Sequence, residues 1–296
     1  MIRLGIFVFS LLILPFIGLW ISGAEWNTAP ANIVEAGIII PATLLTTITL
    51  LGYVFLTSHM VKLYTGTNPL SVQRNYYFAV SGSSAVLGWI LVYLNYYVAS
   101  WVPLHGNLAL EILLYTPLFA LLAPAILSTR ALLGSFKGLL KLLSRGIRFP
   151  DFQAEKLSFT LLAFSAIGLI GGAAFPEQLF GLLWLSPLLL LIAMQLLWNE
   201  STIFSGLKSG DWGRVVCVTL SSIIVCNITV MAYQSNGGSV LINISNSAYV
   251  QIGYAAFGLL CVQLSDVIAE NWRGKKRMEL FQQKKKFPIP VVVKKD

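Results

Sequence analysis

The sequence predicts an all-α polytopic integral membrane protein, a bundle of about eight transmembrane helices with both termini in the cytoplasm (N-in and C-in). Three observations predict it: an apolar composition, eight apolar runs of spanning length, and basic residues confined to alternate connections. Of the 296 residues, 56% are hydrophobic and 11% are charged, and the mean hydropathy is +0.77. A soluble globule has more polar surface than this composition provides, so lipid is the expected solvent.

The eight runs are long enough to cross a bilayer, which takes about 20 mostly apolar residues per helix. The first contains Arg3 near its start and resembles a signal peptide, but it is long and ends in the bulky Trp20 and Ile21, so we interpret it as a retained helix. Only Pro-Glu-Gln at 176–178 separates runs five and six, which predicts a tight helical hairpin. The runs are 2–21, 34–56, 77–99, 108–127, 157–175, 179–198, 215–233 and 249–269.

The basic residues test the orientation independently of hydropathy. With the N-terminus inside, all 20 Lys and Arg residues fall in segments assigned to the cytoplasm, and the four outside connections contain none. A wrong number of helices would place some of them outside, so the segregation supports both the number and the orientation. It also accounts for the net charge of +8 without nucleic acid, which is not an expected partner. A bacterial cytoplasmic (inner) membrane is the expected location.

The longest internal connection, 129–156, divides the chain into helices 1–4 (1–128) and helices 5–8 (157–269), and a basic cytoplasmic tail follows at 270–296. Two proline positions, 41 and 187, and two lysine positions, 62 and 208, recur at an offset of 146 residues. This leaves a parallel duplication of two four-helix groups as a hypothesis.

Within that connection, residues 131–148 predict a cytoplasmic amphipathic helix between helices 4 and 5. Lys137, Lys141, Arg145 and Arg148 recur on one face, and apolar residues cover the other. Such a face attracts anionic lipid by about 1 kcal/mol per basic residue. The four residues are therefore candidate lipid-headgroup contacts at the cytoplasmic face. The alternative is a helix that only anchors the two halves.

The tail after residue 270 is also basic, and its end, 287–293, is an apolar stretch with two prolines. This composition favours docking on other membrane-protein subunits or on the anionic leaflet. A solvated topology anchor is the alternative interpretation.

Ionisable and amide side chains inside the predicted spans are few, and they mark the candidate intramembrane polar site. Glu111 lies one turn into the fourth helix, Asn227 lies near the middle of the seventh, and Gln195 lies in the sixth. Glu111 is the best functional candidate. The alternatives are an end-of-helix carboxylate at the interface for Glu111, and hydrogen bonds between helices for the two amides.

The sequence contains no pattern typical of a metal, cofactor or catalytic centre. His59 and His105 fall on opposite sides of the predicted bilayer, so they cannot share a metal. The three cysteines, Cys217, Cys226 and Cys261, lie inside apolar runs. Their spacing along the sequence is typical neither of a metal site nor of a disulfide framework. There is no phosphate-binding loop, nucleophile elbow or HExxH motif. We therefore expect no metal, no cofactor and no catalytic residues.

These observations favour a non-enzymatic translocator of a small or lipidic substrate, or a subunit of a membrane-envelope complex. The alternative is a membrane-embedded enzyme acting on a lipid or lipid-linked sugar through Glu25, Glu111 or Asp211 at the interface. A cleft lined by two of these carboxylates, or by one beside a basic residue, favours the enzyme. A midplane cavity reaching Asn227 or Gln195 favours transport, and a packed bundle with paired polar groups favours a scaffold.

Overall fold

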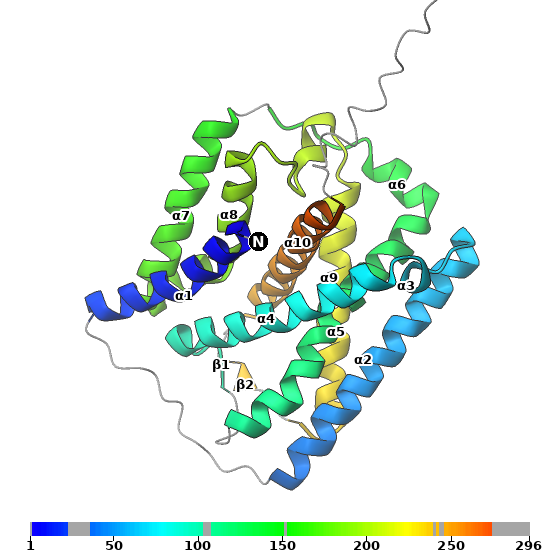
Figure 1. Ribbon diagram of the computed structural model, residues 1–296, viewed down its shortest axis with the longest axis horizontal. Helices are drawn as coiled ribbons and strands as arrows, with labels where there is room; N and C mark the ends of the chain where they lie inside the picture. Colours follow the sequence, from blue (N-terminus) through cyan, green and yellow to red (C-terminus); the bar gives the residue numbers. More distant parts are fainter. Residues whose placement is uncertain are drawn as a thin grey trace, which may run out of the picture.

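The structure, a computed structural model, describes residues 2–22, 36–102, 108–150, 153–238, 241–242 and 246–273. Within these ranges the fold is helical, as predicted, and eight helices have 21 residues or more (Figure 1). They are α1 (Ile2–Ser22), α2 (Ala36–Thr65), α4 (Arg74–Val98), α5 (Leu108–Ser135), α7 (Ala154–Ala174), α8 (Pro176–Leu197), α9 (Gly213–Ser235) and α10 (Ser247–Arg273). The short elements are α3 (Pro69–Val72), α6 (Lys137–Leu143), the 3-10 helix η1 (Ser205–Ser209), and the strands β1 (Trp101–Val102) and β2 (Leu241–Ile242).

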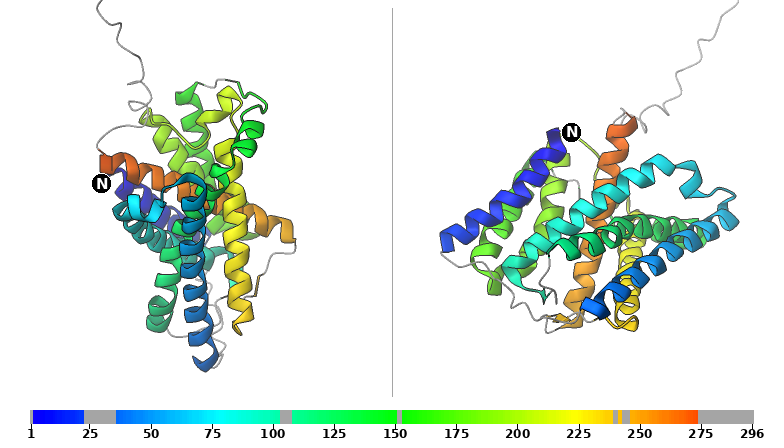
Figure 2. Two further views of the ribbon diagram at one scale, coloured as in Figure 1. Left: turned by 90° about the vertical axis from the view of Figure 1, so that its right-hand side faces the viewer. Right: turned by 60° about the horizontal axis from the view of Figure 1, so that its bottom comes forward.

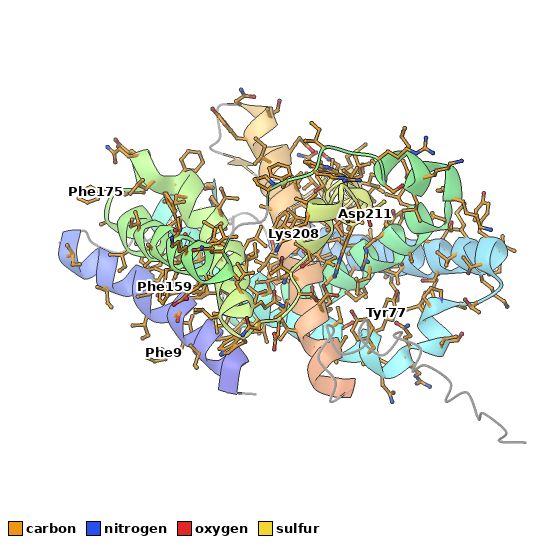
Figure 3. All side chains as sticks on the ribbon, turned by 90° about the horizontal axis from the view of Figure 1, so that it is seen from above. Phe9, Tyr77, Phe159, Phe175, Lys208 and Asp211 are labelled. Carbon is orange, nitrogen blue, oxygen red and sulfur yellow. The ribbon has the colours of Figure 1, made fainter. Side chains whose placement is uncertain are left out.

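Seven helices of the described part are long and apolar enough to cross a membrane, namely α2, α4, α5, α7, α8, α9 and α10. The longest unbroken run of described side chains in α1 is Ile6–Pro15, which is shorter than a span, so an eighth crossing stays a prediction. Large apolar side chains are exposed: Phe9, Phe159 and Phe175 are 64%, 56% and 58% exposed, and Phe9 and Phe175 lie at the edge of the molecule in Figure 3. Soluble monomers rarely expose apolar surface on this scale. The chain is a multi-pass membrane protein.

The tight hairpin predicted between the fifth and sixth runs is confirmed. Helix α7 ends at Ala174, only Phe175 intervenes, and α8 begins at Pro176. Proline fits this place because the first backbone N–H groups of a helix have no acceptor within the helix. Two glycines let α7 and α8 approach closely: a Cβ on Gly168 would lie 2.7 Å from the Leu182 carbonyl oxygen, and one on Gly172 would lie 2.7 Å from Leu183 Cβ. The small-residue string of α7 is thus used for close packing.

Two helices run further than predicted at the ends that carry basic residues. Helix α2 continues to Thr65 rather than 56, and α5 continues to Ser135 rather than 127. Polar residues after positions 56 and 127 favour helix ends there in the sequence, but in the structure these residues form hydrogen bonds between α2 and α5. The Thr57 hydroxyl donates to Ser128 Oγ over 2.9 Å, and the Tyr53 and Thr129 hydroxyls lie 2.9 Å apart.

The single amphipathic helix predicted over 131–148 is divided in the structure. Residues 131–135 finish α5, the extended backbone of Phe136 breaks the helix, and α6 then covers only Lys137–Leu143. The chain after α6 forms backbone hydrogen bonds with the loop around η1: Trp212 N–H donates to the Leu143 carbonyl over 3.0 Å, and Gly146 N–H donates to the Gly210 carbonyl over 2.9 Å. These bonds replace the helical ones expected there.

The long helices form two groups joined by a crossing pair. Figures 1 and 2 show α1, α7 and α8 on one side and α2, α5 and α9 on the other, with α4 and α10 between them. Helix α1 packs mainly on α7, and α9 packs on α10, α5 and α2. The contacts of α1 with α7, and of α9 with α5 and α2, join helices from different halves of the sequence.

Hydrogen bonds between helices establish which helix ends lie together. Tyr76 at the start of α4 donates to the Ser265 carbonyl near the end of α10, and Ile203 N–H, after α8, donates to Gln263 of α10. We call this the basic end, because the described basic side chains occupy it: Lys62, Arg74, Arg130, Lys137, Lys141, Arg145, Arg148, Lys156, Lys208 and Arg214. The opposite end contains Glu111, Glu177 and the antiparallel pair of β1 with β2. That the basic end faces the cytoplasm stays a prediction.

Candidate functional site

Glu111 lies in the first turn of α5, at the opposite end of the bundle, and is only 8% exposed. Among the residues that the structure describes, no side chain forms an ion pair or a hydrogen bond with its carboxylate. Tyr115, one turn further along α5, lies within electrostatic reach. A carboxylate enclosed in a membrane bundle without a cation is costly as an anion, so it needs a proton or a bound cation.

The hydroxyl of Tyr115 joins three helices beside Glu111. It shares a side-chain hydrogen bond with Thr43 of α2 and lies 3.4 Å from the Tyr233 hydroxyl of α9. Its ring stacks on Phe119 with the ring centroids 5.9 Å apart. Glu111 therefore stands next to a polar junction of α2, α5 and α9, with an aromatic layer on its inner side.

Asn227 forms a reciprocal amide pair with Gln251 of α10. Its Nδ2 donates to Gln251 Oε1 over 2.8 Å, and Gln251 Nε2 donates back to Asn227 Oδ1 over 3.2 Å. Asn227 Nδ2 also donates to the Ile223 carbonyl over 2.8 Å. These hydrogen bonds satisfy both polar atoms of the Asn227 side-chain amide within the bundle, so Asn227 links α9 to α10.

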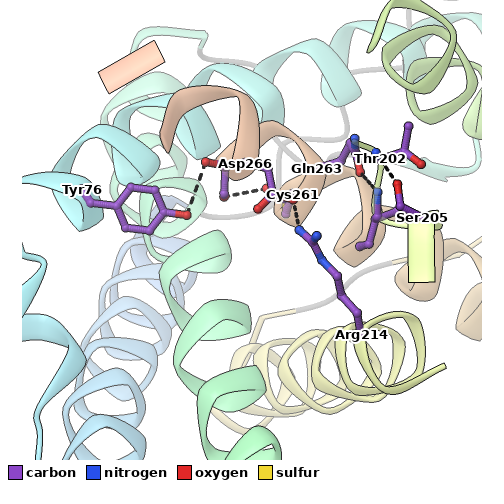
Figure 4. A network of polar contacts seen from close by, with 9 residues as sticks. Tyr76, Thr202, Ser205, Arg214, Cys261, Gln263 and Asp266 are labelled. Atoms are coloured by element: carbon purple, nitrogen blue, oxygen red, sulfur yellow. Dashed lines mark hydrogen bonds and ion pairs between the residues drawn. The ribbon is translucent and has the colours of Figure 1, made fainter. Parts of the chain in front are cut away.

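Gln195 lies near the end of α8 and is 1% exposed. Neither of its side-chain polar atoms has a hydrogen-bond partner in the described structure. Its backbone carbonyl accepts from Glu200 N–H over 2.8 Å, and Gln263, whose Nε2 is also enclosed without a partner, accepts from Ile203 N–H over 2.7 Å (Figure 4). Both glutamines thus adjoin the turn after α8, at the basic end.

The structure does not bring the three predicted polar residues together. Glu111 is at the opposite end, Asn227 is midway along α9, and Gln195 is at the basic end. The candidate lipid contacts are exposed: Lys137 and Lys141 lie on α6, and Arg145 and Arg148 follow it.

The carboxylates proposed for an enzyme are separated in the same way. Asp211, labelled with Lys208 in Figure 3, lies just before α9 at the basic end, where its Oδ1 accepts from Gly213 N–H over 2.9 Å. Glu111 lies at the other end of the bundle, and Glu25 lies outside the described residues.

Sequence reasoning missed a set of polar residues at the basic end. Arg214 of α9 pairs with Asp266 of α10, and their side chains are only 15% and 17% exposed (Figure 4). Arg130 of α5 is half-buried and interacts electrostatically with Tyr76, Tyr77 and Cys217. Arg130 falls in the predicted connection 129–156, although the apolar Ala131, Leu132 and Leu133 that follow it are a signal that the helix continues.

No group of three or more metal-ligating side chains occurs among the described residues. No family model, curated protein or solved structure matches the chain. The arrangement itself offers one enclosed carboxylate for a proton or cation at the opposite end and arginines at the basic end.

Proposed function

We propose that the chain is a non-enzymatic translocator of a small or lipidic substrate, with Glu111 as its proton-binding group. The observation that carries the proposal is the burial of Glu111, a residue that is 8% exposed, with no cation partner for its carboxylate among the described side chains. Intramembrane carboxylates of this kind occur in proton relays of pumps and transporters. In the proposed cycle, a proton and a cationic group of the substrate alternately neutralise the Glu111 carboxylate.

Polar groups of α5, the helix that packs against α2 and α9, lie near both of its ends. Glu111 and Tyr115 lie near one end, Ser128 and Thr129 lie near the other, and the apolar Leu118 lies between. The 18 residues from Glu111 to Thr129 span about 27 Å at 1.5 Å per residue. This is close to the hydrocarbon thickness of about 30 Å. This spacing fits α5 as a membrane span, with Glu111 near one surface of the bilayer.

The geometry is less favourable to an enzyme, because Glu111 and Asp211 stand at opposite ends of the bundle. A subunit of a membrane-envelope complex is the second candidate, and α6 supports it. This helix carries the basic Lys137 and Lys141 next to Leu142, which is 73% exposed. A surface of this kind suits contact with a membrane interface or with another subunit. For either function we place the chain in a bacterial cytoplasmic membrane with the basic end inside.

The test uses protons as the probe, because it needs no knowledge of the substrate. The purified chain is reconstituted in liposomes that contain a pH-sensitive dye, and a potassium diffusion potential drives protons inward. We expect faster acidification than in protein-free liposomes, and we expect Glu111→Gln to remove the difference. The matched control is Glu177→Gln, since Glu177 is an exposed carboxylate at the same end of the bundle.

A rate equal to that of protein-free liposomes would overturn the proposal of a proton-coupled translocator. An unchanged rate in Glu111→Gln would remove Glu111 from the site. Native mass spectrometry after mild extraction tests the second candidate, which requires copurifying membrane-protein subunits in a fixed ratio.

A further inference from the structure

We propose that Arg130 and Tyr77 form a binding site for one phosphate group at the basic end, between α4, α5 and α9. This inference does not rest on translocation, because Arg130 and Glu111 lie near opposite ends of α5.

The first observation is that no carboxylate in the described part of the chain forms an ion pair with Arg130. The groups that interact with it electrostatically are Tyr76, Tyr77 and Cys217. None of the described carboxylates forms an ion pair with its guanidinium, and no described group accepts a hydrogen bond from it. A half-buried guanidinium thus keeps its five N–H donors for a ligand, and their planar geometry matches phosphate oxygens.

Arg214 provides an internal comparison at the same end of the bundle. It is also largely enclosed, but the fold neutralises it with Asp266. The other nearby carboxylate, Asp211, accepts from Gly213 N–H. Of these two arginines, Arg214 therefore has a carboxylate partner, whereas none of the described carboxylates pairs with Arg130.

The second observation is the hydroxyl of Tyr77. This residue is 7% exposed, and its hydroxyl has no hydrogen-bond partner among the described groups. It lies within electrostatic reach of Arg130, one helix away. A guanidinium and a neutral O–H donor on the adjacent helices α5 and α4, within electrostatic reach of each other, suit an anion with several acceptor oxygens.

The position of Arg130 suits a phosphate near the membrane surface. It lies five residues before the end of α5, about 8 Å along the helix axis. The exposed Lys137 and Lys141 of α6 follow and increase the local concentration of anions. The phosphate comes either from a lipid headgroup or from a soluble phosphate, and the same donors recognise both.

The experiment measures binding to the delipidated full-length chain in a neutral detergent. One arm adds phosphatidylglycerol, a second adds inorganic phosphate, and a third adds diacylglycerol, which has no phosphate. Native mass spectrometry counts the bound molecules, and the shift of the melting temperature gives the affinity. We expect one bound phosphate compound and no effect of diacylglycerol.

Substitutions connect this binding to the site. Loss of charge-assisted hydrogen bonds in Arg130→Gln should weaken binding by about tenfold or more. Tyr77→Phe removes only the hydroxyl and should weaken it by about threefold to tenfold, which keeps the test valid if Arg130→Gln fails to fold. The matched control is Arg74→Gln, an exposed arginine at the same end whose guanidinium lies over the Phe78 ring; it should bind normally.

The two phosphate arms identify the source. Binding of phosphatidylglycerol alone assigns a lipid headgroup, and binding of inorganic phosphate without lipid assigns a soluble phosphate. The proposal is overturned if neither binds, if diacylglycerol binds equally well, or if Arg130→Gln and Tyr77→Phe both bind like the unchanged protein.

Discussion

Gly168→Ala should destabilise the hairpin of α7 and α8, whereas Gly181→Ala should not. Gly168 is buried where the two helices touch: a Cβ there would contact Ser186 Oγ and lie 2.7 Å from the Leu182 carbonyl oxygen. The backbone of α8 cannot rotate away as a side chain can, so the helices must separate. Gly181 is exposed on α8, and a Cβ there meets nothing within 4 Å.

The pair of variants isolates the cost of this clash. Both replace a helical glycine by alanine, so both gain a similar intrinsic helix propensity, about 1 kcal/mol. Overpacking of a tight interface costs about 1–3 kcal/mol. We therefore expect the free energy of unfolding of Gly168→Ala to be about 1–3 kcal/mol below that of Gly181→Ala. Separation of the helices should also weaken the bond from Ser165 Oγ to the Ser186 carbonyl, now 3.0 Å long.

Unfolding of the purified variants in mixed micelles, followed by circular dichroism as a function of denaturing detergent, measures this difference. Equal midpoints and slopes for the two variants would refute the close approach of α7 and α8 at Gly168.

Two further predictions concern polar links between helices. Asn227→Leu and Gln251→Leu should each lower the free energy of unfolding of the bundle. The double substitution should lower it by less than the sum of the two single losses, with a coupling of about 0.5–1.5 kcal/mol. Strict additivity of the losses in the same unfolding assay would contradict the amide pair. Asp266→Asn should cost about 3 kcal/mol, because it leaves the enclosed Arg214 without its anion. Exchanging the two residues, Arg214→Asp with Asp266→Arg, should restore part of the loss, and no recovery would argue against a direct ion pair.

The helices were predictable because a bilayer imposes a minimum apolar length on each span. All eight predicted runs coincide with long helices, and the short break at 176–178 produced the expected hairpin. The errors lie at the ends of α2 and α5. Thr57, Thr129 and Arg130 look like interface residues in the sequence, but hydroxyl pairs between α2 and α5 keep two of them inside continuing helices.

The polar contacts were less predictable, because they depend on which helices become neighbours. Asn227 and Gln251 are 24 residues apart, and no periodicity shows that they meet. The predicted amphipathic helix followed from its spacing alone, whereas bonds from the η1 loop to Leu143 and Gly146 shorten it to α6. The pairing of Arg214 with Asp266, and the lack of such a pair for Arg130 among the described residues, likewise appear only in three dimensions.

The number of crossings and their direction underlie the whole account, and cysteine labelling tests them most directly. Ser144→Cys, at the basic end, and Gln178→Cys, after α7, place exposed thiols on either side of one predicted span, while the three native cysteines are buried. A membrane-impermeant maleimide should label Gln178→Cys in intact cells and Ser144→Cys only after permeabilisation. Labelling of both from the same side would contradict α7 as a membrane span, and the reverse pattern would contradict a cytoplasmic basic end.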